Sequence, residues 1–326
     1  MTVPAPDVDS QKIESPSLLD AVPSLAAAAP TSRKTKAKPE RRTAEVTRLL
    51  PTPVLLIGTG VILAAIAVPL LYIVFASMNS DVEVARGAYF PTQFTLANYT
   101  KIWDTLPLAN GLFNSITIAG AVAVVASALG IVTAYVLVRF EFLGRLTILR
   151  GLIGLQSVPG TLLLLPVFVV FASAGNYLGI TVIGTSWGLF LAYLTFALPF
   201  ATWVLVTYLR GLPRELEEAA RIDGASSVGV LVRIIVPLSW PGLVVSGVFS
   251  FLLGWNDVLF ASVLTRPDTQ TAAVVLQIFG ASAEGGSLPL YGQMMAASLV
   301  CAVPVVVLYL VFQRFLVGGL TAGSVK

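Results

Sequence analysis

Long runs of this chain carry no Asp, Glu, Lys or Arg, and short charged segments separate them. The charge-free runs cover residues 49–80, 105–138, 151–209, 234–256 and 285–313. A helix needs about 20 consecutive apolar residues to cross a lipid bilayer. Each run is therefore long enough for one such helix, and the third run is long enough for two.

A group of turn-forming residues divides that third run. Gly175, Asn176, Gly179, Thr181 and Gly184 lie close together, and such a cluster predicts a turn between two helices. The sequence thus predicts an all-α integral membrane protein with six membrane-spanning helices. We place them at about 53–77, 112–138, 151–174, 185–209, 242–264 and 291–314.

The composition agrees with a membrane protein and excludes several chemistries. Of the 326 residues, 56% are hydrophobic and 11% are charged, whereas soluble domains carry about 25% charged residues. His is absent and Cys301 is the single cysteine. Disulfide frameworks, Cys/His zinc sites, haem ligation by His and His-based catalysis are therefore excluded. Cys301 lies in an apolar run and is predicted to be a buried hydrophobic residue, and no metal site is expected.

The distribution of Lys and Arg predicts the orientation in the membrane. With the N-terminus in the cytoplasm, 17 of the 20 basic residues fall on the cytoplasmic side, as the positive-inside rule requires. Arg86, Lys101 and Arg266 are then the three external ones. Both termini are predicted to be cytoplasmic. The net charge of +3 does not indicate a nucleic-acid partner, because the basic residues lie mostly beside the membrane helices.

The cytoplasmic segment 210–242 predicts two short amphipathic helices joined at a tight corner. Pro213 suits the first position of a helix, where its missing N–H costs no hydrogen bond. The helix dipole favours acidic residues in the first turns, and these are Glu215, Glu217 and Glu218. Apolar residues at helical spacing predict one shared face, formed by Leu212, Leu216, Ala219 and Ala220.

The corner and the second helix follow directly. Asp223 and Gly224 predict the end of the first helix, because Gly readily adopts the left-handed conformation. Ser226 or Ser227 can cap the second helix, which is predicted to end by Pro237. One interpretation is a loop on the membrane surface. A docking element for a soluble partner explains the acidic residues better, because acidic side chains are unfavourable beside anionic lipid.

The same segment resembles the EAA signature of ABC importer membrane subunits. Glu218-Ala219-Ala220, Gly224, Ile234 and Val236-Pro237 have the spacing of that signature, although the family usually has Leu where Val236 stands. Asp223-Gly224-Ala225 and Pro241-Gly242 match the form common in sugar-importer permeases. Further matches are Asn98-Tyr99, Asn114-Ser115, Ala134-Tyr135, Arg139-Phe140 with Phe142 and Gly144, Pro199-Phe200, Trp255-Asn256-Asp257 and the ending Gly319-Leu320-Thr321-Ala322-Gly323. The chain is most similar to the second membrane subunit of maltose-type importers, from about residue 54 onward.

This resemblance implies a type I ABC importer permease fold in a bacterial plasma membrane, importing a sugar such as an oligo- or disaccharide. In that family the loop sits in a cleft of a cytoplasmic ATPase, so that closure of the ATPase dimer rocks the membrane helices. The implied partners are a second homologous permease subunit, two ATPase copies and an extracellular solute-binding protein. The implied coupling residues are Glu217, Glu218, Ala219, Ala220, Asp223, Gly224, Ala225 and Pro237.

The chain itself is not expected to be an enzyme or to bind a cofactor. A phosphate-binding loop requires a Gly-Lys pair, and no Lys follows a Gly in this sequence. ATP and Mg are therefore expected on the separate ATPase.

Four parts of the chain are predicted. Residues 1–48 form a disordered, basic cytoplasmic tail, because they hold too few apolar residues to fold alone. Its charges either hold the orientation of the first helix or bind anionic lipid or a partner. Residues 49–109 contain the first membrane helix and an external loop. Residues 110–314 form the ABC transmembrane domain, and 315–326 a cytoplasmic C-terminal tail, whose likeness to the maltose-type ending suggests a contact with the ATPase pair.

Polar residues within the predicted helices are candidates for the translocation pathway, because they are costly in a membrane. Asp257 either contacts substrate or orders the neighbouring loop. Hydrogen bonds between helices are the commoner use of polar side chains there, with pathway lining second; this concerns Asn114, Ser115, Gln156 and Asn256. Trp255 either stacks on a sugar ring or marks the membrane interface, and the sequence favours the interface.

Two other functions remain open from the residues alone. A proton-coupled carrier could use Asp257 as its titrating group, but the Gly-cornered acidic loop would then have no role. An ABC importer could instead carry a non-sugar solute such as glycerol phosphate or a polyamine. An intramembrane enzyme has few candidate catalytic groups in a chain without His.

Overall fold

The computed structural model describes residues 51–91, 94–285 and 290–321, with backbone only at 283–285 and 317–321. The predicted tail 1–48 lies outside the described residues. The chain divides into two units, one ending at Ile62 and the other beginning at Leu63. Within the described ranges every regular element is helical, as the apolar pattern predicts.

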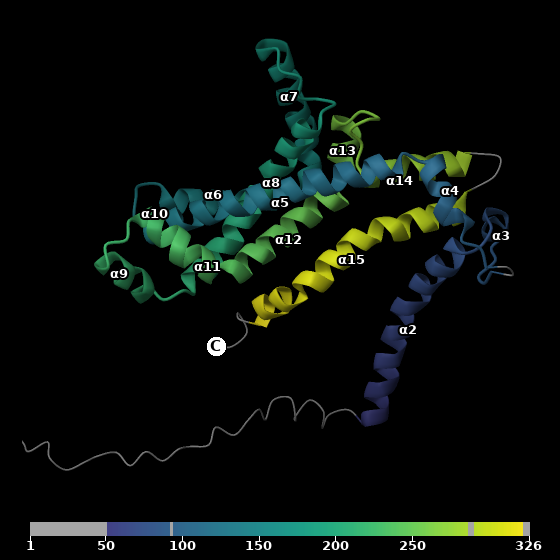
Figure 1. The fold of residues 1–326 in the computed structure, drawn as a ribbon, viewed down its shortest axis with the longest axis horizontal. Coiled ribbons are helices and arrows are strands. Elements are labelled where there is room, and N and C mark those ends of the chain that lie inside the picture. Colours follow the sequence, from purple (N-terminus) through teal and green to yellow (C-terminus); the bar gives the residue numbers. More distant parts are fainter. Residues whose placement is uncertain (1–50, 92–93, 286–289, 322–326) are drawn as a thin grey trace, which may run out of the picture. The chain divides into compact units, whose positions relative to one another are not determined.

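The elements follow one another through the chain and are labelled in Figure 1. They are α2 (Thr52–Ser77), α3 (Asp81–Ala85), α4 (Ala97–Thr105), α5 (Leu108–Arg139), α6 (Arg145–Ser157), η1 (Gly160–Leu163), α7 (Leu164–Leu178), α8 (Ser186–Arg210), α9 (Glu215–Ile222), α10 (Ser227–Val230), η2 (Leu231–Ile235), α11 (Val236–Leu238), α12 (Trp240–Asn256), α13 (Leu259–Leu264), α14 (Ala272–Gly285) and α15 (Tyr291–Thr321).

Among the described residues, five helical stretches are long and apolar enough to cross a membrane. They are Thr52–Ser77, Leu108–Arg139, Gly160–Leu178, Ser186–Arg210 and Tyr291–Leu316. A sixth crossing results if Ser227–Leu238 and Trp240–Asn256, which meet at a 76° bend, count as one broken span. The structure therefore supports five to six of the six predicted crossings.

The helix predicted at 151–174 is interrupted. The helix α6 ends at Ser157, Val158 is extended with ψ 123°, and the chain resumes helical structure at Gly160. Pro159 is the physical cause, because proline lacks an N–H and disfavours helical backbone at the residue before it. The absence of charge from this run could not reveal that break.

The helix predicted at 242–264 is also interrupted, at Asp257 and Val258. The first piece, α12, has 17 residues and is therefore about 26 Å long, and the second, α13, has six residues. The backbone of Asp257 is extended at ψ 133°. Its side chain accepts hydrogen bonds from the first turn of α13, so it starts a new helix instead of continuing the old one.

The last helix is longer than predicted. It continues past Arg314 to Thr321, so residues 315–321 of the predicted cytoplasmic tail are helical. The rest of that tail lies outside the described residues. The external loop predicted between the first two membrane helices contains two short helices, α3 and α4, and α14 lies between the fifth predicted helix and α15.

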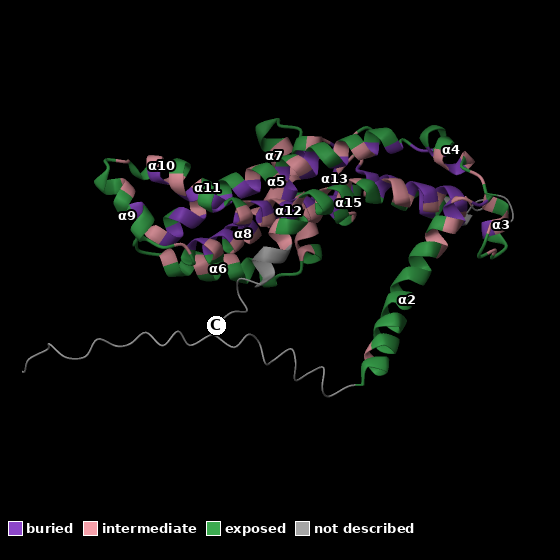
Figure 2. Ribbon diagram, turned by 60° about the horizontal axis from the view of Figure 1, so that its bottom comes forward, coloured by how far each residue is buried: buried purple, intermediate pink, exposed green. Residues whose placement is uncertain are grey.

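Three helices, α5, α8 and α12, pack against one another and contain much of the buried surface (Figures 1 and 2). Small residues permit the close approach, as is typical between membrane helices. A Cβ added at Gly130 of α5 would lie 3.2 Å from Leu205 Cδ1 of α8. The hydroxyls of Ser127 and Ser246 form a 2.9 Å hydrogen bond between α5 and α12. This three-helix core positions both regions considered below.

Candidate functional site

The predicted corner between two short helices is present beside the C-terminal ends of α5 and α8. The helix α9 ends at Ile222, and Gly224 has φ +84°, in the left-handed region that favours glycine. The Oγ of Ser226 accepts a 3.2 Å hydrogen bond from the N–H of Gly229 and so caps α10. Both capping expectations are confirmed. The first helix begins at Glu215 rather than at Pro213.

Helical structure after the corner does not stop at Pro237. It continues from α10 through the π-helical turn η2 into α11 and ends at Leu238. The N–H of Val236 bonds to the carbonyl of Leu231, five residues back. The wider π turn changes the hydrogen-bond register directly before Pro237, which places the proline at the start of α11, where it is tolerated.

The faces of α9 differ from the expected pattern. Leu216 is 45% exposed and Ala219 is exposed, whereas Glu217 is 4% exposed. Glu217 is buried because its Oε1 accepts a 2.5 Å charge-assisted hydrogen bond from Nε of Arg139, the last residue of α5. A buried carboxylate is stable when it is paired in this way. Glu217 therefore contacts the body of the protein, and the apolar side chain of Leu216 faces outward.

An exposed surface remains around the corner, which Figure 2 shows largely in green at α9. We call it the corner surface. Its apolar members are Leu216, Ile222, Val228 and Val232, of which Ile222 is 86% exposed. Its acidic members are Glu218 and Asp223, both exposed. Exposed apolar side chains gathered at one projecting corner, with charged side chains among them, mark an interaction surface.

Asn114 and Ser115 lie near the N-terminal end of α5 and hold the segment before α14. The side-chain amide of Asn114 donates to the carbonyls of Asp268 and Gln270, at 3.1 and 2.9 Å. The Oγ of Ser115 accepts a 2.9 Å hydrogen bond from the N–H of Ala272, the first residue of α14. Both side chains thus fix the segment 268–272 to α5.

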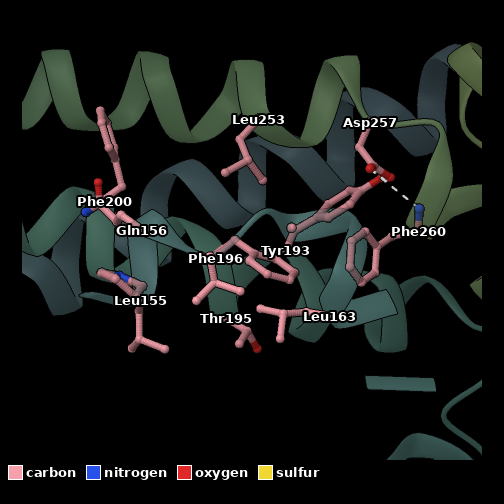
Figure 3. A pocket seen from close by; sticks show the side chains of 13 residues that line it. Leu155, Gln156, Leu163, Tyr193, Thr195, Phe196, Phe200, Leu253, Asp257 and Phe260 are labelled. Carbon is pink, nitrogen blue, oxygen red and sulfur yellow. Dashed lines mark hydrogen bonds between the residues drawn. The ribbon is translucent and has the colours of Figure 1, made fainter. Parts of the chain in front are cut away.

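Asp257 joins α8 to the interruption between α12 and α13. Its Oδ2 accepts hydrogen bonds from the hydroxyl of Tyr193 at 2.9 Å and from the N–H of Ala261 at 3.0 Å. Its Oδ1 accepts from the N–H of Phe260 at 3.5 Å, the bond drawn as a dashed line in Figure 3. These partners give Asp257 a structural role.

The same carboxylate lies at one end of a cavity of about 390 Å³. Asp257 and Phe260 line one end of this cavity, and Gln156 and Phe200 line the other (Figure 3). Between them lie the aromatic rings of Tyr193 and Phe196 from α8. The remaining lining residues are Leu155, Val158, Gly160, Leu163, Thr195, Pro199 and Leu253.

Asn256 and Trp255 at the end of α12 together line a second cavity of about 390 Å³. Asn256 is exposed and lines a neighbouring groove of about 550 Å³ together with Asp257, Phe200 and Phe249. Trp255 is 8% exposed and stacks on Phe251, with 5.4 Å between ring centroids. The membrane-interface position that the sequence favoured for Trp255 stays a prediction.

Sequence reasoning did not single out Tyr193, Phe196 or the pairing of Arg139. Tyr193 is a polar ring in a run without charges, which is a weak signal, because the hydroxyl of a tyrosine bonds wherever the fold offers an acceptor. Arg139 was noted as part of the resemblance, but its partner lies 78 positions away. Within the described ranges, Cys, Asp and Glu side chains form no group of three that could hold a metal ion.

Comparison with known proteins identifies the family. The family model described as "Binding-protein-dependent transport system inner membrane component" matches residues 126–320. The trehalose transport system permease protein SugB of Mycobacterium tuberculosis is 34% identical over 260 residues, which cover 79% of this chain and 92% of that protein. The trehalose/maltose transport system permease protein MalG of Thermococcus litoralis is 33% identical, over 84% of this chain and 96% of that protein.

A solved structure supports the same fold. A chain of a bacterial ABC transporter involved in the import of the acidic polysaccharide alginate superposes with a TM-score of 0.68. The match covers 84% of this chain and 98% of that one, at 20% sequence identity. The chain has the fold of ABC importer permeases, and it belongs to the binding-protein-dependent transport system inner membrane components, as a multi-pass permease subunit of the bacterial plasma membrane.

Proposed function

We propose that this permease imports a sugar, an oligo- or disaccharide, as part of an ATP-driven complex. The observation that carries this proposal is the corner surface, an exposed apolar and acidic projection on a chain that has no phosphate-binding loop of its own. Relatives named as permeases for trehalose, maltose and alpha-glucosides support a sugar as cargo.

The corner surface is the docking site for a cytoplasmic ATPase in this proposal. Glu218, Ala219, Asp223 and Gly224 form the projecting part, and Ala220, Ala225 and Pro237 connect it to the helices behind. Closure of an ATPase dimer moves the corner, and the membrane helices change between outward-facing and inward-facing arrangements. ATP and Mg bind to that ATPase, and this chain catalyses no covalent step.

The cavity beside Asp257 contributes to the translocation pathway. Aromatic rings pack against the apolar faces of sugars, and carboxamide and carboxylate groups hydrogen-bond to hydroxyls. The cavity offers Phe196 and Phe200 for the first role, and Gln156 and Asp257 for the second. Asn256 extends the polar lining into the neighbouring groove.

The complex contains a second homologous permease subunit, two ATPase copies and an extracellular solute-binding protein. Both termini lie in the cytoplasm, and α12 of the bent pair crosses the membrane as the sixth span, with Ser227–Leu238 on the cytoplasmic side. Because 17 of the 20 basic residues then lie inside, the positive-inside rule supports this arrangement.

The test is to tag the chain, extract it gently from its own membranes and identify what accompanies it by mass spectrometry. We expect an ATPase with a phosphate-binding loop and a second permease. Recovery of the chain alone or as a homodimer, under conditions that keep known membrane complexes intact, would contradict the proposal.

The cargo is tested in liposomes that contain the purified complex and its binding protein. ATP hydrolysis is measured with trehalose, maltose, an alginate oligosaccharide, glycerol 3-phosphate and a polyamine. We expect stimulation by a neutral sugar. Stimulation by glycerol 3-phosphate or the polyamine alone would retain the importer and reject the sugar.

A proton-coupled carrier is disfavoured by the surroundings of Asp257. Its carboxylate accepts hydrogen bonds from Tyr193 and from two backbone N–H groups, and these bonds hold the start of α13 against α8. A proton-coupled carrier would also leave the corner surface without a role.

A further inference from the structure

We infer that Arg139 and Glu217 form a positioning pair that fixes the coupling helix α9 to the end of α5. Through this pair, α5 transmits the movement of α9 to the membrane helices. This inference rests on the proposed function, because it concerns how the corner surface drives the membrane helices. Neither residue is assigned a substrate or ATPase contact in it.

The Arg139–Glu217 pair is buried, and two hydrogen bonds fix the guanidinium of Arg139 in place. Nε of Arg139 lies 2.5 Å from Oε1 of Glu217, and each side chain is 5% exposed. Nη2 of the same guanidinium donates a 3.2 Å hydrogen bond to the carbonyl of Leu212, in the segment between α8 and α9. One planar group therefore bonds to both α9 and the segment leading into it, which sets the position and the direction of α9 against α5.

The pair is an ion pair and not an apolar contact. Removing a charged pair from water is costly, and an apolar contact would anchor a helix as well. The planar guanidinium donates its hydrogen bonds in fixed directions, so it restricts the orientation of a helix more than an apolar contact does. We therefore assign the pair to orientation rather than to anchoring alone.

The remaining contacts of α9 would let it turn. Leu216, Glu218, Ala219 and Ile222 are exposed. Ala220 is half-buried and packs against the apolar cluster at the inner ends of α5 and α8. Without the Arg139–Glu217 pair, α9 would keep its docking face and its corner, but its angle to α5 would no longer be fixed.

The helix that receives this tie reaches the opposite side of the membrane domain. Arg139 is the last residue of α5, and Asn114 and Ser115 near its other end hold the segment before α14. Twenty-five residues of α-helix separate Asn114 from Arg139, which corresponds to about 37 Å. Along that length α5 packs against α8 and α12. A movement of α9 can thus reach the core and the external segment through one continuous helix.

The test uses the whole complex in liposomes, with Glu217→Gln and Glu217→Ala, and with the binding protein and whichever of trehalose or maltose stimulates the wild type. We measure three quantities: the ATPase retained per permease, the stimulation of hydrolysis by the loaded binding protein, and the sugar transported per ATP. Glu141→Gln removes the same charge from an exposed residue two positions beyond Arg139 and is the matched control.

We expect both Glu217 variants to retain the ATPase at wild-type stoichiometry while stimulation and sugar transported per ATP fall about tenfold. The control should behave as wild type. Wild-type sugar per ATP in Glu217→Ala at normal abundance would overturn the inference. Loss of the ATPase from an otherwise intact membrane pair would also overturn it, because Glu217 would then belong to the docking contact.

A milder variant decides the matter if the Glu217 variants do not accumulate. Arg139→Lys keeps the positive charge, but a single ammonium group does not reach both Glu217 and the carbonyl of Leu212 as the guanidinium does. We expect coupling between the wild-type value and the Glu217→Gln value, and wild-type coupling would overturn the inference. A wild-type complex without any ATPase overturns the proposed function itself, which keeps the two failures distinguishable.

Discussion

The hydroxyl of Tyr193 donates a 2.9 Å hydrogen bond to Oδ2 of Asp257, and this bond connects the first third of α8 to the interruption between α12 and α13. The ring of Tyr193 is 1% exposed and also packs on α12, where a Cβ added at Gly254 would lie 3.0 Å from it. Asp257 bonds in turn to the first turn of α13. The Asp257 side chain therefore connects Tyr193, which lines the cavity, to the point where α12 ends and α13 begins.

The first prediction concerns that bond. Tyr193→Phe keeps the packing but leaves Asp257 with its backbone partners only. We expect a loss of about 1–2 kcal/mol, since hydrogen bonds to charged groups lie at the upper end of the usual range. The apparent Tm of the purified complex in detergent should fall accordingly. Tyr177→Phe is the matched control, because Tyr177 is 87% exposed, and an equal fall in both variants would contradict the prediction.

The second prediction separates a structural Asp257 from a titrating one. Asp257→Asn keeps an oxygen that can accept from Tyr193 and Ala261, so it should transport sugar with an unchanged dependence on pH. Asp257→Ala removes the acceptor and should lose most transport and thermal stability. The measurement is sugar uptake into liposomes at pH values from about 5.5 to about 8. Loss of uptake at every pH in both Asp257→Asn and Asp257→Ala would contradict this prediction, because transport would then require a carboxylate.

The third prediction concerns the corner. Gly224 has φ +84°, and a side chain in the left-handed region costs roughly 1–2 kcal/mol at a single residue. Gly224→Val should therefore distort the turn between α9 and α10 and uncouple ATP hydrolysis from transport. Gly229→Ala is the control, because its Cβ would meet Ser226 Oγ at an ordinary 3.4 Å. Normal transport by Gly224→Val at normal membrane abundance would refute the proposed role of the corner.

The fourth prediction concerns the cavity. Phe200 lines both the cavity and the neighbouring groove, and its ring lies 5.6 Å from that of Phe249. Phe200→Leu removes an aromatic face but keeps most of the apolar volume. We expect the KM for sugar uptake to rise several-fold with kcat less affected, because the contact would be made to bound substrate. Phe113→Leu, at a 68% exposed position outside both linings, should leave KM unchanged.

The sequence by itself determined the class of protein and the local elements of the cytoplasmic corner. Charge-free runs predict membrane helices because a bilayer excludes charge over about 20 residues. The left-handed Gly224 and the capping Ser226 were predictable because capping and corner chemistry act within three or four residues. Pro159 and Asp257 are visible in the sequence, but their interruptions of two predicted helices depend on backbone bonds that the apolar pattern does not encode.

The tertiary structure decided which polar residues are paired and which faces are open. Glu217 and Arg139 are 78 positions apart, and Tyr193 and Asp257 are 64 apart. Helical periodicity places a residue on a face, but it does not say which face meets the core. The face of α9 that meets the core lies against the guanidinium of Arg139. The buried residue of α9 is therefore the carboxylate Glu217, and the apolar Leu216 is exposed. Partners so distant along the chain come together only when α5, α8 and α12 have packed.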